Sequence, residues 1–410
     1  MIYKYIRVLF ACLAFSVMAC KNDGKGVLGT SDYYHVDELK EFRVARHSKD
    51  TIKGELFLSP EIGAREIGLH DSVLIVMADP STPLLFHLYN VNTREEVCSF
   101  GDTEIDEGGL QHFSIARKIF SIGKAGYGET SYCSLYGIDG MEQYFPDMFY
   151  VVESNGRLWL NVHDRITTRF FDLNKTIEQR KGVFTTHRSH DFGKYHFCLN
   201  LKGDSSVVMK ELSTVGSRFK RYTPPKIFCY AGGKRKDVCI YPNILKDKNI
   251  GAFDFMYSAL KPRIKPDKTK VVEALCLMDI INVIDVKTGK VLGLKEAGTY
   301  NFEDVEKFPR DSTFSERIMS FNQVMQVTDN YIYLLQDRCS EKELNRGNKK
   351  RLQTLLILDW KGNLKSQVCL DRNITSMACD EKNSLLYGIA SKGQIYRFDL
   401  SKCFGAKNKP

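Results

Sequence analysis

The chain has 410 residues, of which 43% are hydrophobic and 27% charged, so it contains enough apolar side chains for a large packed core. Its net charge is +9, and the basic residues form many short groups instead of one stripe. Nucleic-acid binding is therefore not expected, because it requires a concentrated basic surface. Solvated loop charges are the simpler interpretation, and an acidic glycan or lipid headgroup is the alternative partner.

The first twenty residues indicate export. Lys4 and Arg7 precede an apolar run over residues 8–17, which is too short to span a bilayer and has the length of a signal-peptide core. The following Val-Met-Ala-Cys, residues 17–20, resembles the lipobox of bacterial lipoproteins. We therefore expect residues 1–19 to be removed and Cys20 to be lipidated. An ordinary signal peptide cut elsewhere, or an uncleaved anchor, is the alternative.

Residues 20–35 are polar and contain several glycines, which predicts a tether between the lipid and the folded domain. The tripeptide at residues 21–23, Lys-Asn-Asp, resembles in part the surface-export signal of Bacteroidetes lipoproteins. We expect an outer-membrane lipoprotein, held to the membrane through Cys20, on either the periplasmic face or the cell surface.

Ten cysteines follow Cys20, and most lie inside apolar strands, where a buried thiol acts as a small core residue. The equal spacings of Cys229 to Cys239 and of Cys369 to Cys379 permit a disulfide in either pair, since export allows oxidation. The sequence leaves both pairings open. No pair has CxxC spacing, so neither a metal knuckle nor a thioredoxin-like site is indicated.

Residues 355–400 show the building pattern of the chain most clearly. LLILDW, LKSQVCL, ITSMACD, SLLYGIA and QIYRFDL are rich in β-branched, aromatic and leucine residues, and short turns separate them. Turns of two to four residues cannot hold a crossover helix, so neighbouring strands must pair antiparallel.

The motif of an apolar residue, Asp or Asn, a polar turn and a further strand recurs along the chain. The copies lie at residues 88–100, 171–183, 199–211, 284–294, 358–370 and 398–402. The Asp or Asn side chain suits the start of a turn, and Gly289 and Gly362 suit its left-handed position.

These copies predict an all-β propeller of six blades, with seven possible because residues 114–138 have room for a poorly marked blade. A β-sandwich and a chance recurrence of a common turn are the alternatives. The spacing of the copies is uneven, and the first residues of the copies at 171–183 and 199–211 are only 28 positions apart.

The two ends of the chain are expected to meet. The strand near residues 394–400 is the third of a blade that lacks a fourth, while two extended segments near residues 35–48 and 51–59 lack partners. Open sheet edges favour aggregation, so we expect one of these segments to complete the last blade. Residues 36–410 would then form a single propeller domain.

The combination of a lipoprotein signal, a short tether, irregular β-hairpins and FGDTEIDEGGLQHF at residues 100–113 resembles the TolB-like six-bladed propeller lipoproteins of Bacteroides and relatives. Phe100-Gly101 and the Glu-Gly-Gly at 107–109 match the segment that follows the first blade in that family. The resemblance implies a propeller fold and an envelope location, and it implies no particular activity.

Several groups of polar residues were considered as sites. His187, His190 and His196 with Asp191 suggest zinc or copper, but 187 and 190 point to opposite faces of one strand. His163-Asp164-Arg165 follows a predicted strand, at the place of a blade rim. Asp102, Glu104, Asp106 and Glu107 are carboxylates of the kind that bind calcium or act in glycosidases. GKAGYG at 123–128 has the glycine content of a phosphate-binding loop.

The simpler interpretations are loop histidines without a metal, a hydrogen-bonded turn at 163–165 and a solvated acidic loop, and the segment at 123–128 lacks the lysine and the following Ser/Thr of a P-loop. No catalytic, metal or cofactor site is therefore predicted. The sequence favours a non-catalytic binding or scaffold propeller for a protein or glycan partner in the envelope. The alternatives are a glycan-active hydrolase or lyase, and metal-dependent sensing or redox work.

Overall fold

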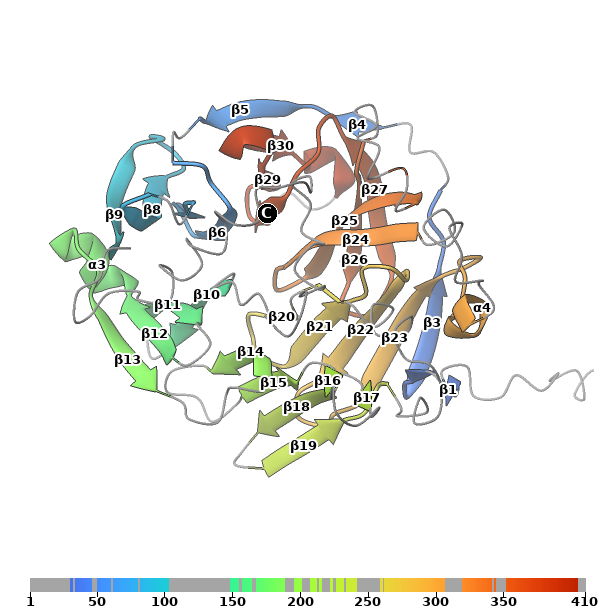
Figure 1. Ribbon diagram of the computed structural model, residues 1–410. Coiled ribbons are helices and arrows are strands. Elements are labelled where there is room, and N and C mark those ends of the chain that lie inside the picture. The colour runs from blue at the N-terminus through green and yellow to red at the C-terminus, as the bar shows by residue number, and fades with distance from the viewer. Residues whose placement is uncertain are drawn as a thin grey trace, which may run out of the picture.

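The computed structural model describes residues 30–31, 34–45, 50–59, 62–79, 82–102, 148–154, 157–163, 167–188, 195–200, 207–211, 214–215, 222–223, 226–231, 234–241, 259–260, 262–306, 319–340, 343 and 352–404. Within these residues, six sheets of four or five strands stand around a common centre (Figure 1). This arrangement is a β-propeller, as the sequence predicted, and each sheet is one blade. None of the described helices has the length and apolar character needed to cross a membrane.

The first three blades follow each other along the chain. Blade 1 contains β6 (Glu66–His70), β7 (Val73–Met77), β8 (Leu84–Asn90) and β9 (Glu96–Asp102). Blade 2 contains β10 (Met148–Ser154), β11 (Arg157–His163), β12 (Thr167–Asp172) and β13 (Phe184–Arg188), with α3 (Leu173–Gln179) between the last two. Blade 3 contains β14 (Tyr195–Asn200), β15 (Val207–Glu211), β18 (Lys226–Ala231) and β19 (Lys234–Val238), and the small hairpin β16 (Thr214–Val215) and β17 (Tyr222–Thr223) is inserted in it.

The last three blades each gain a strand from the N-terminal segment. Blade 4 contains β20 (Arg263–Ile264), β21 (Lys270–Ala274), β22 (Ile280–Asp285), β23 (Val291–Glu296) and then β3 (Glu38–Phe42), and α4 (Phe302–Glu306) follows it. Blade 5 contains β24 (Met319–Val327), β25 (Tyr331–Ser340), β26 (Thr354–Asp359), β27 (Leu364–Leu370) and β4 (Thr51–Ile52). Blade 6 contains β28 (Ser376–Asp380), β29 (Leu385–Ile389), β30 (Ile395–Asp399) and β5 (Gly54–Leu58), with the 3-10 turns η7 (Ser391–Gly393) and η8 (Ser401–Cys403).

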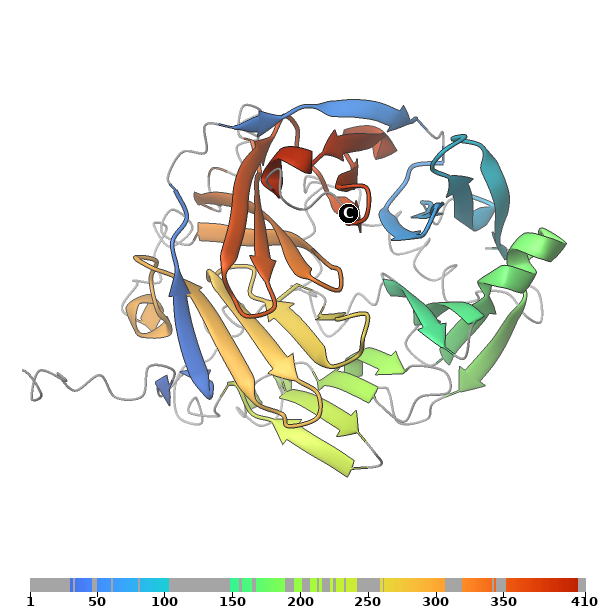
Figure 2. The same ribbon diagram turned by 180° about the vertical axis from the view of Figure 1, so that it is seen from behind.

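The predicted closure of the ring is confirmed. Strand β5 pairs antiparallel with β30 and supplies the fourth strand of blade 6. The earlier extended segment also joins the ring, because β3 pairs with β23 and β4 pairs with β27, both in parallel. We call residues 38–58 the N-terminal belt, since its three strands cover the outer edges of blades 4, 5 and 6 (Figure 2).

The turn chemistry expected from the repeated motif is present. Oδ1 of Asp359 accepts a hydrogen bond from the amide of Lys361 at 3.0 Å, and Oδ1 of Asn90 accepts one from the amide of Asn92 at 2.8 Å. Gly362 has a φ of 77°, where a residue with a side chain would be strained. The side-chain cap and the left-handed glycine together close a tight turn between the third and fourth strands of a blade.

Two of the six motif copies differ from the expectation. The copy at 199–211 joins the first and second strands of blade 3, whereas the other full copies join third and fourth strands, so its spacing of 28 residues does not measure a blade. In the copy at 171–183 the turn is replaced by α3, whose N-cap Asp172 accepts from the amide of Lys175. Residues 114–138, the expected place for a seventh blade, lie outside the described residues.

The hydrophobic core lies between neighbouring blades. Buried leucines and isoleucines of β25 and β26 pack against blade 4 on one side and against blade 6 on the other. Phe57 of β5 joins the cluster between blades 6 and 1, where its ring meets Tyr387 edge to face at a centroid distance of 5.0 Å. Each blade therefore buries both faces against its neighbours, and the belt strand β5 contributes directly to this packing.

Candidate functional site

Tyr34 fixes the start of the N-terminal segment against blade 4. Its hydroxyl lies where any Cβ on Gly293 would be, so this glycine makes room for it. The hydroxyl donates to Oδ1 of Asn282 at 2.6 Å, and Nδ2 of Asn282 donates to the hydroxyl of Tyr241 at 2.8 Å. Tyr241 donates to Oε2 of the fully buried Glu273 at 2.8 Å. Burial, and then the Glu273 carboxylate, raises the pKa of both tyrosines, so both remain protonated donors.

An ion pair between opposite blades crosses the centre of the ring. Arg263 belongs to β20, the innermost strand of blade 4, and Glu66 belongs to β6, the innermost strand of blade 1 (Figure 1). Nη2 of Arg263 lies 3.4 Å from Oε1 of Glu66, and Nε of Arg263 donates to the carbonyl of Met325 at 3.2 Å. Two charged side chains from opposite blades and a backbone carbonyl from a third blade thus meet near the axis of the ring.

A second polar cluster joins blades 4 and 5. Strands alternate in direction within a blade, so the β21–β22, β23–β24 and β25–β26 connections all emerge on one side of the ring, which we call the loop face. Here Arg338 holds Glu296 with two hydrogen bonds of 2.6 and 2.7 Å. Nε2 of Gln336 donates to Oδ1 of Asp279 at 2.9 Å and to Oδ1 of Asn322 at 3.0 Å.

The pKa values of the two carboxyl groups of this cluster are shifted in opposite directions. Oδ2 of Asp279 is buried and accepts no hydrogen bond, although Nη1 of Arg338 lies 3.9 Å away. Burial, and then contact with Glu296, raises the pKa of Asp279 well above its ordinary value. Burial alone would raise the pKa of Glu296, but hydrogen bonds from Asp279 and Arg338 hold it below its ordinary value. The surroundings therefore favour the protonated form of Asp279 and the ionised form of Glu296.

The chemistry available to the cluster follows from its exposure. Asp279 is completely buried and Glu296 nearly so, whereas the side chain of Arg338 is 24% exposed. Solvent and ligands can therefore reach the guanidinium more easily than the protonated acid behind it. The backbone of Arg338 has a φ of 54°, which is uncommon for a residue with a side chain. The cluster ties two blades together and presents a positive group at the loop face.

A cleft of about 250 Å³ lies at the rim, where the N-terminal segment joins blades 3 and 4. Its lining includes His35, Asp37, Asp237 and Cys239, all with exposed side chains. These are residue types that bind metals, but in the described part of the chain no three such side chains lie close enough to hold an ion. The amide of His35 donates to the carbonyl of Ile240 at 2.8 Å, so the cleft marks the place where the tether meets the ring.

Two of the histidines considered from the sequence lie on strands of different blades. His187 lies on β13 of blade 2 and His196 lies on β14 of blade 3, while His190 and Asp191 are outside the described residues. His163 ends β11 and Asp102 ends β9. The rest of their motifs are outside the described residues: Asp164, Arg165, Glu104, Asp106, Glu107 and GKAGYG at 123–128, as is the lipidation residue Cys20.

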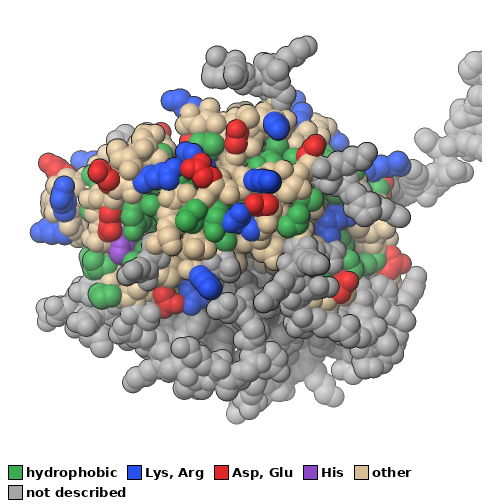
Figure 3. All heavy atoms as spheres, turned by 90° about the horizontal axis from the view of Figure 1, so that it is seen from above, with side chains coloured by type: hydrophobic (Ala, Val, Ile, Leu, Met, Phe, Trp, Pro, Cys, Tyr) green, Lys and Arg blue, Asp and Glu red, His purple; other side chains and the backbone are tan. Residues whose placement is uncertain are grey.

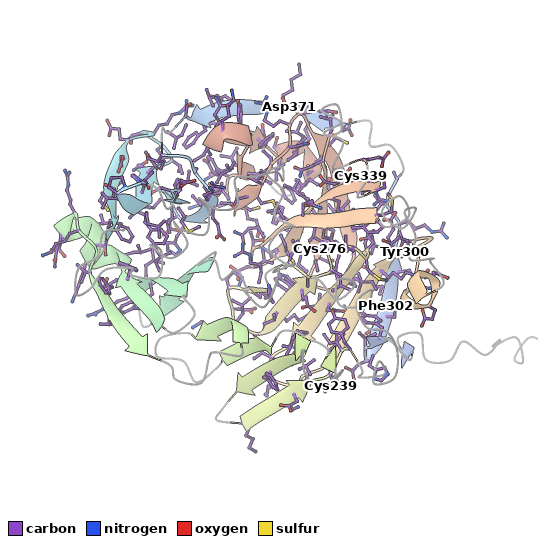
Figure 4. All side chains as sticks on the ribbon, viewed as in Figure 1. Cys239, Cys276, Tyr300, Phe302, Cys339 and Asp371 are labelled. Atoms are coloured by element: carbon purple, nitrogen blue, oxygen red, sulfur yellow. The ribbon has the colours of Figure 1, made fainter. Side chains whose placement is uncertain are left out.

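The cysteines of the two possible disulfides are free thiols in the structure. Cys229 is buried in β18 and Cys239 is exposed just after β19, and Cys369 and Cys379 belong to different blades. Figure 4 shows Cys239 at the rim, far from Cys276 and Cys339, which are buried. Burial is the main cause that raises the pKa of Cys229, to about 12, so this thiol is unreactive at neutral pH.

Sequence reasoning missed the axial ion pair and the loop-face cluster. Their members are distant in sequence, since Glu66 and Arg263 are 197 positions apart, so no local motif contains them. One signal was available, since Asp279 interrupts the apolar run CLMDIINVI at 276–284, and a lone acid in such a run must be paired or protonated. The partners of that acid could not be read from the sequence.

The sequence matches no protein-family model and no curated protein. Among solved structures, a member of the duf4221 family from Bacteroides vulgatus is 8% identical, with a TM-score of 0.46 over 86% of this chain and 94% of that one. A Bacteroides fragilis protein described as exported is 8% identical, with a TM-score of 0.46 over 88% of this chain and 97% of that one.

The β-propeller domain of Cps50 (Swd1) from Myceliophteria thermophila is 9% identical, with a TM-score of 0.39 over 85% of this chain and all of that domain. All three of these similarities have TM-scores below 0.5. At such low identity they assign no activity, ligand or partner to this chain.

Proposed function

We propose that this chain is a cell-envelope lipoprotein that acts as a non-catalytic binding or scaffold propeller for a protein or glycan partner. Its lipid anchor is on Cys20, and it stands on the outer membrane, at the periplasmic face or the cell surface. The resemblance of the sequence to TolB-like six-bladed lipoproteins of Bacteroides and relatives supports this proposal. No metal, cofactor or nucleic acid is required for it.

The observation that carries the proposal is the N-terminal belt. The chain enters the ring at Tyr34, pairs with blades 4 and 5, and completes blade 6 through β5. A tether that continues directly into three blades makes the ring and its anchor one mechanical unit. Such a design suits a protein that must hold a rigid surface near a membrane.

The surface is compatible with a polar partner. Viewed from the side of the rim, basic and acidic side chains are intermingled over the described part of the molecule (Figure 3). On the belt, Glu55 pairs with Arg94 at 3.0 Å and with Arg397 at 2.6 Å, so charges there are already matched within the chain. Arg338 on the loop face, which is 24% exposed and paired with Glu296, and the rim cleft are the contact points that we propose for a partner.

The test is a pull-down of the full chain from cross-linked envelopes, with labelled fatty acid supplied to the cells. We expect label on the wild type but not on Cys20→Ala, and at least one partner recovered reproducibly with the wild type. Arg338→Gln should weaken that recovery if the loop face makes the contact. A chain that carries no label, or that recovers no partner in repeated experiments, would count against the proposal.

The opposite pKa shifts of Asp279 and Glu296 favour one alternative, a glycan-active hydrolase or lyase. A protonated carboxylic acid beside a carboxylate and an arginine resembles the acid and base pair of such enzymes in composition. Glycosidases, however, place their two carboxyl groups at least about 5 Å apart with the sugar between them. Asp279 is completely buried and Glu296 nearly so, so a sugar cannot reach a position between them and we rank this function second.

A further inference from the structure

We propose that the open edge of β3 is the docking site for residues 27–29 of the tether, which add to blade 4 as one more strand and draw the anchor toward the ring. The pairing itself requires no lipid. Its consequence for the distance between ring and membrane rests on the proposed anchor at Cys20.

The first step of this docking is already present. Strand β1 (Thr30–Ser31) pairs antiparallel with β2 (Tyr34–His35), in a register that joins Thr30 to His35 and Ser31 to Tyr34. The tether therefore turns back on itself before it joins the ring. Continued in the same register, the hairpin would bring Gly29 opposite Val36 and Val27 opposite Glu38.

The hydrogen-bonding groups needed for this continuation face the correct way. The amide of His35 donates to Ile240, and the amide of Asp37 donates to the carbonyl of Val291 at 3.0 Å, so both point toward the ring. Amides alternate in direction along an extended strand, and those of Val36 and Glu38 therefore point to the other edge. Strand β3 is the last strand of its sheet within the described residues, and no described backbone group pairs with that edge.

The side chains favour the tether as the occupant and limit its extent. Val27 and Leu28 are the two apolar residues of the segment at 21–29, next to a hairpin that already fixes the register. Further pairing would place Lys25 opposite Lys40, and like charges opposite each other destabilise a sheet. Gly26 and Gly29 weaken a strand, so the docked state is expected to form reversibly.

Docking would change the reach of the anchor. Thr30 lies ten positions after Cys20, which allows about 35 Å when fully extended, whereas Val27 lies seven positions after Cys20, which allows about 25 Å. The point of departure also moves along β3, away from the rim cleft. The same chain could thus present the ring at two distances from the membrane.

Amide hydrogen exchange of the full chain at single-residue resolution tests this inference. We expect the amides of Val36 and Glu38 to exchange at least about tenfold more slowly in the wild type than in Val27→Pro, which cannot pair at that position. Gly24→Pro, outside the docked segment, should keep the protection. The amides of Asp37 and Leu39 face blade 4 and serve as internal references, because they should be unchanged in all three chains.

Two results would overturn the inference. One is rapid exchange at Val36 and Glu38 in the wild type, comparable with that in Val27→Pro. The other is protection that increases with protein concentration and survives Val27→Pro, because a second copy would then occupy the edge. The Cys20→Ala chain should show the same exchange pattern as the lipidated one. Failure of the lipid anchor and failure of the docking are therefore separate outcomes.

Discussion

Replacement of Phe57 by alanine tests whether the belt closes the ring. Phe57 is 4% exposed and lies between blade 6 and blade 1, where it packs against Tyr387 and the residues around Ile67. Arg94 also lies over its ring, with 5.2 Å from the guanidinium carbon to the ring centroid. Removal of a buried phenylalanine side chain costs about 3–5 kcal/mol, and this position loses an aromatic pair as well. We expect the free energy of unfolding to fall by about 4 kcal/mol.

The matched control is the neighbouring Leu56, which lies on the same strand and is 45% exposed. Because its side chain faces solvent, Leu56→Ala should change the free energy of unfolding by less than about 0.5 kcal/mol. A similar loss in both variants would mean that the strand itself was disturbed, and the comparison of inward and outward side chains would then not support closure.

Urea unfolding followed by tryptophan fluorescence measures the effect far from the substitution. The two tryptophans are Trp159 in blade 2 and Trp360, which follows β26 in blade 5. In a Trp360→Phe background, fluorescence reports blade 2 alone. A ring closed by β5 should unfold as one unit, so Phe57→Ala should shift the Trp159 transition by the full amount. An unchanged Trp159 transition, with an early loss of β-sheet circular dichroism, would refute the cooperative closure.

Three further results are expected from the polar networks. Burial raises the pKa of Asp279 well above its ordinary value, so its protonated form contributes stability that is present at pH 4 and declines as the pH rises toward that pKa. Urea midpoints measured from pH 5 to 9 should therefore fall in the wild type and stay flat in Asp279→Asn. Burial alone would raise the pKa of Asp359, but hydrogen bonds from Asn363 and Lys361 and the nearby Lys365 lower it to about 2. The stabilisation by this carboxylate is therefore present above about pH 4 and is lost as the pH falls toward 2. Acid unfolding of Asp359→Asn should be less steep than that of the wild type. Tyr34→Phe leaves Oδ1 of Asn282 without its donor and should cost about 1–3 kcal/mol by urea unfolding, and no loss would contradict the role of the tyrosine in holding the N-terminal segment.

The sequence predicts the strands of this fold better than their partners. All five strands between 355 and 400 are found where alternation and turn residues place them, because short turns leave only antiparallel pairing to the next strand. The closure by β5 was also predictable, since a three-stranded end of a propeller requires a fourth strand from elsewhere. The copy at 171–183 misled because Asp172 caps a helix as readily as it starts a turn.

Long-range partners were beyond reach of the sequence for a physical reason. Strand β3 joins blade 4 in parallel, and no turn or local motif specifies a parallel pair whose members are 254 residues apart. The same holds for the loop-face cluster, which takes Asp279 and Glu296 from blade 4 and Arg338 from blade 5. Such groups are brought together by the closed ring, so their chemistry becomes visible only with the fold.

The central claim is that the protein binds a partner without cleaving it, and it is tested most directly by measuring whether bound material is retained unchanged or is converted to products. The purified full chain would be incubated with plant and host polysaccharides and with envelope extract, and both the bound material and any cleavage products would be measured by mass spectrometry. Our interpretation predicts that a component is retained unchanged, with less retained by Arg338→Gln. Cleavage products formed by the wild type and lost in Asp279→Asn would contradict a binding or scaffold role and would favour the enzyme.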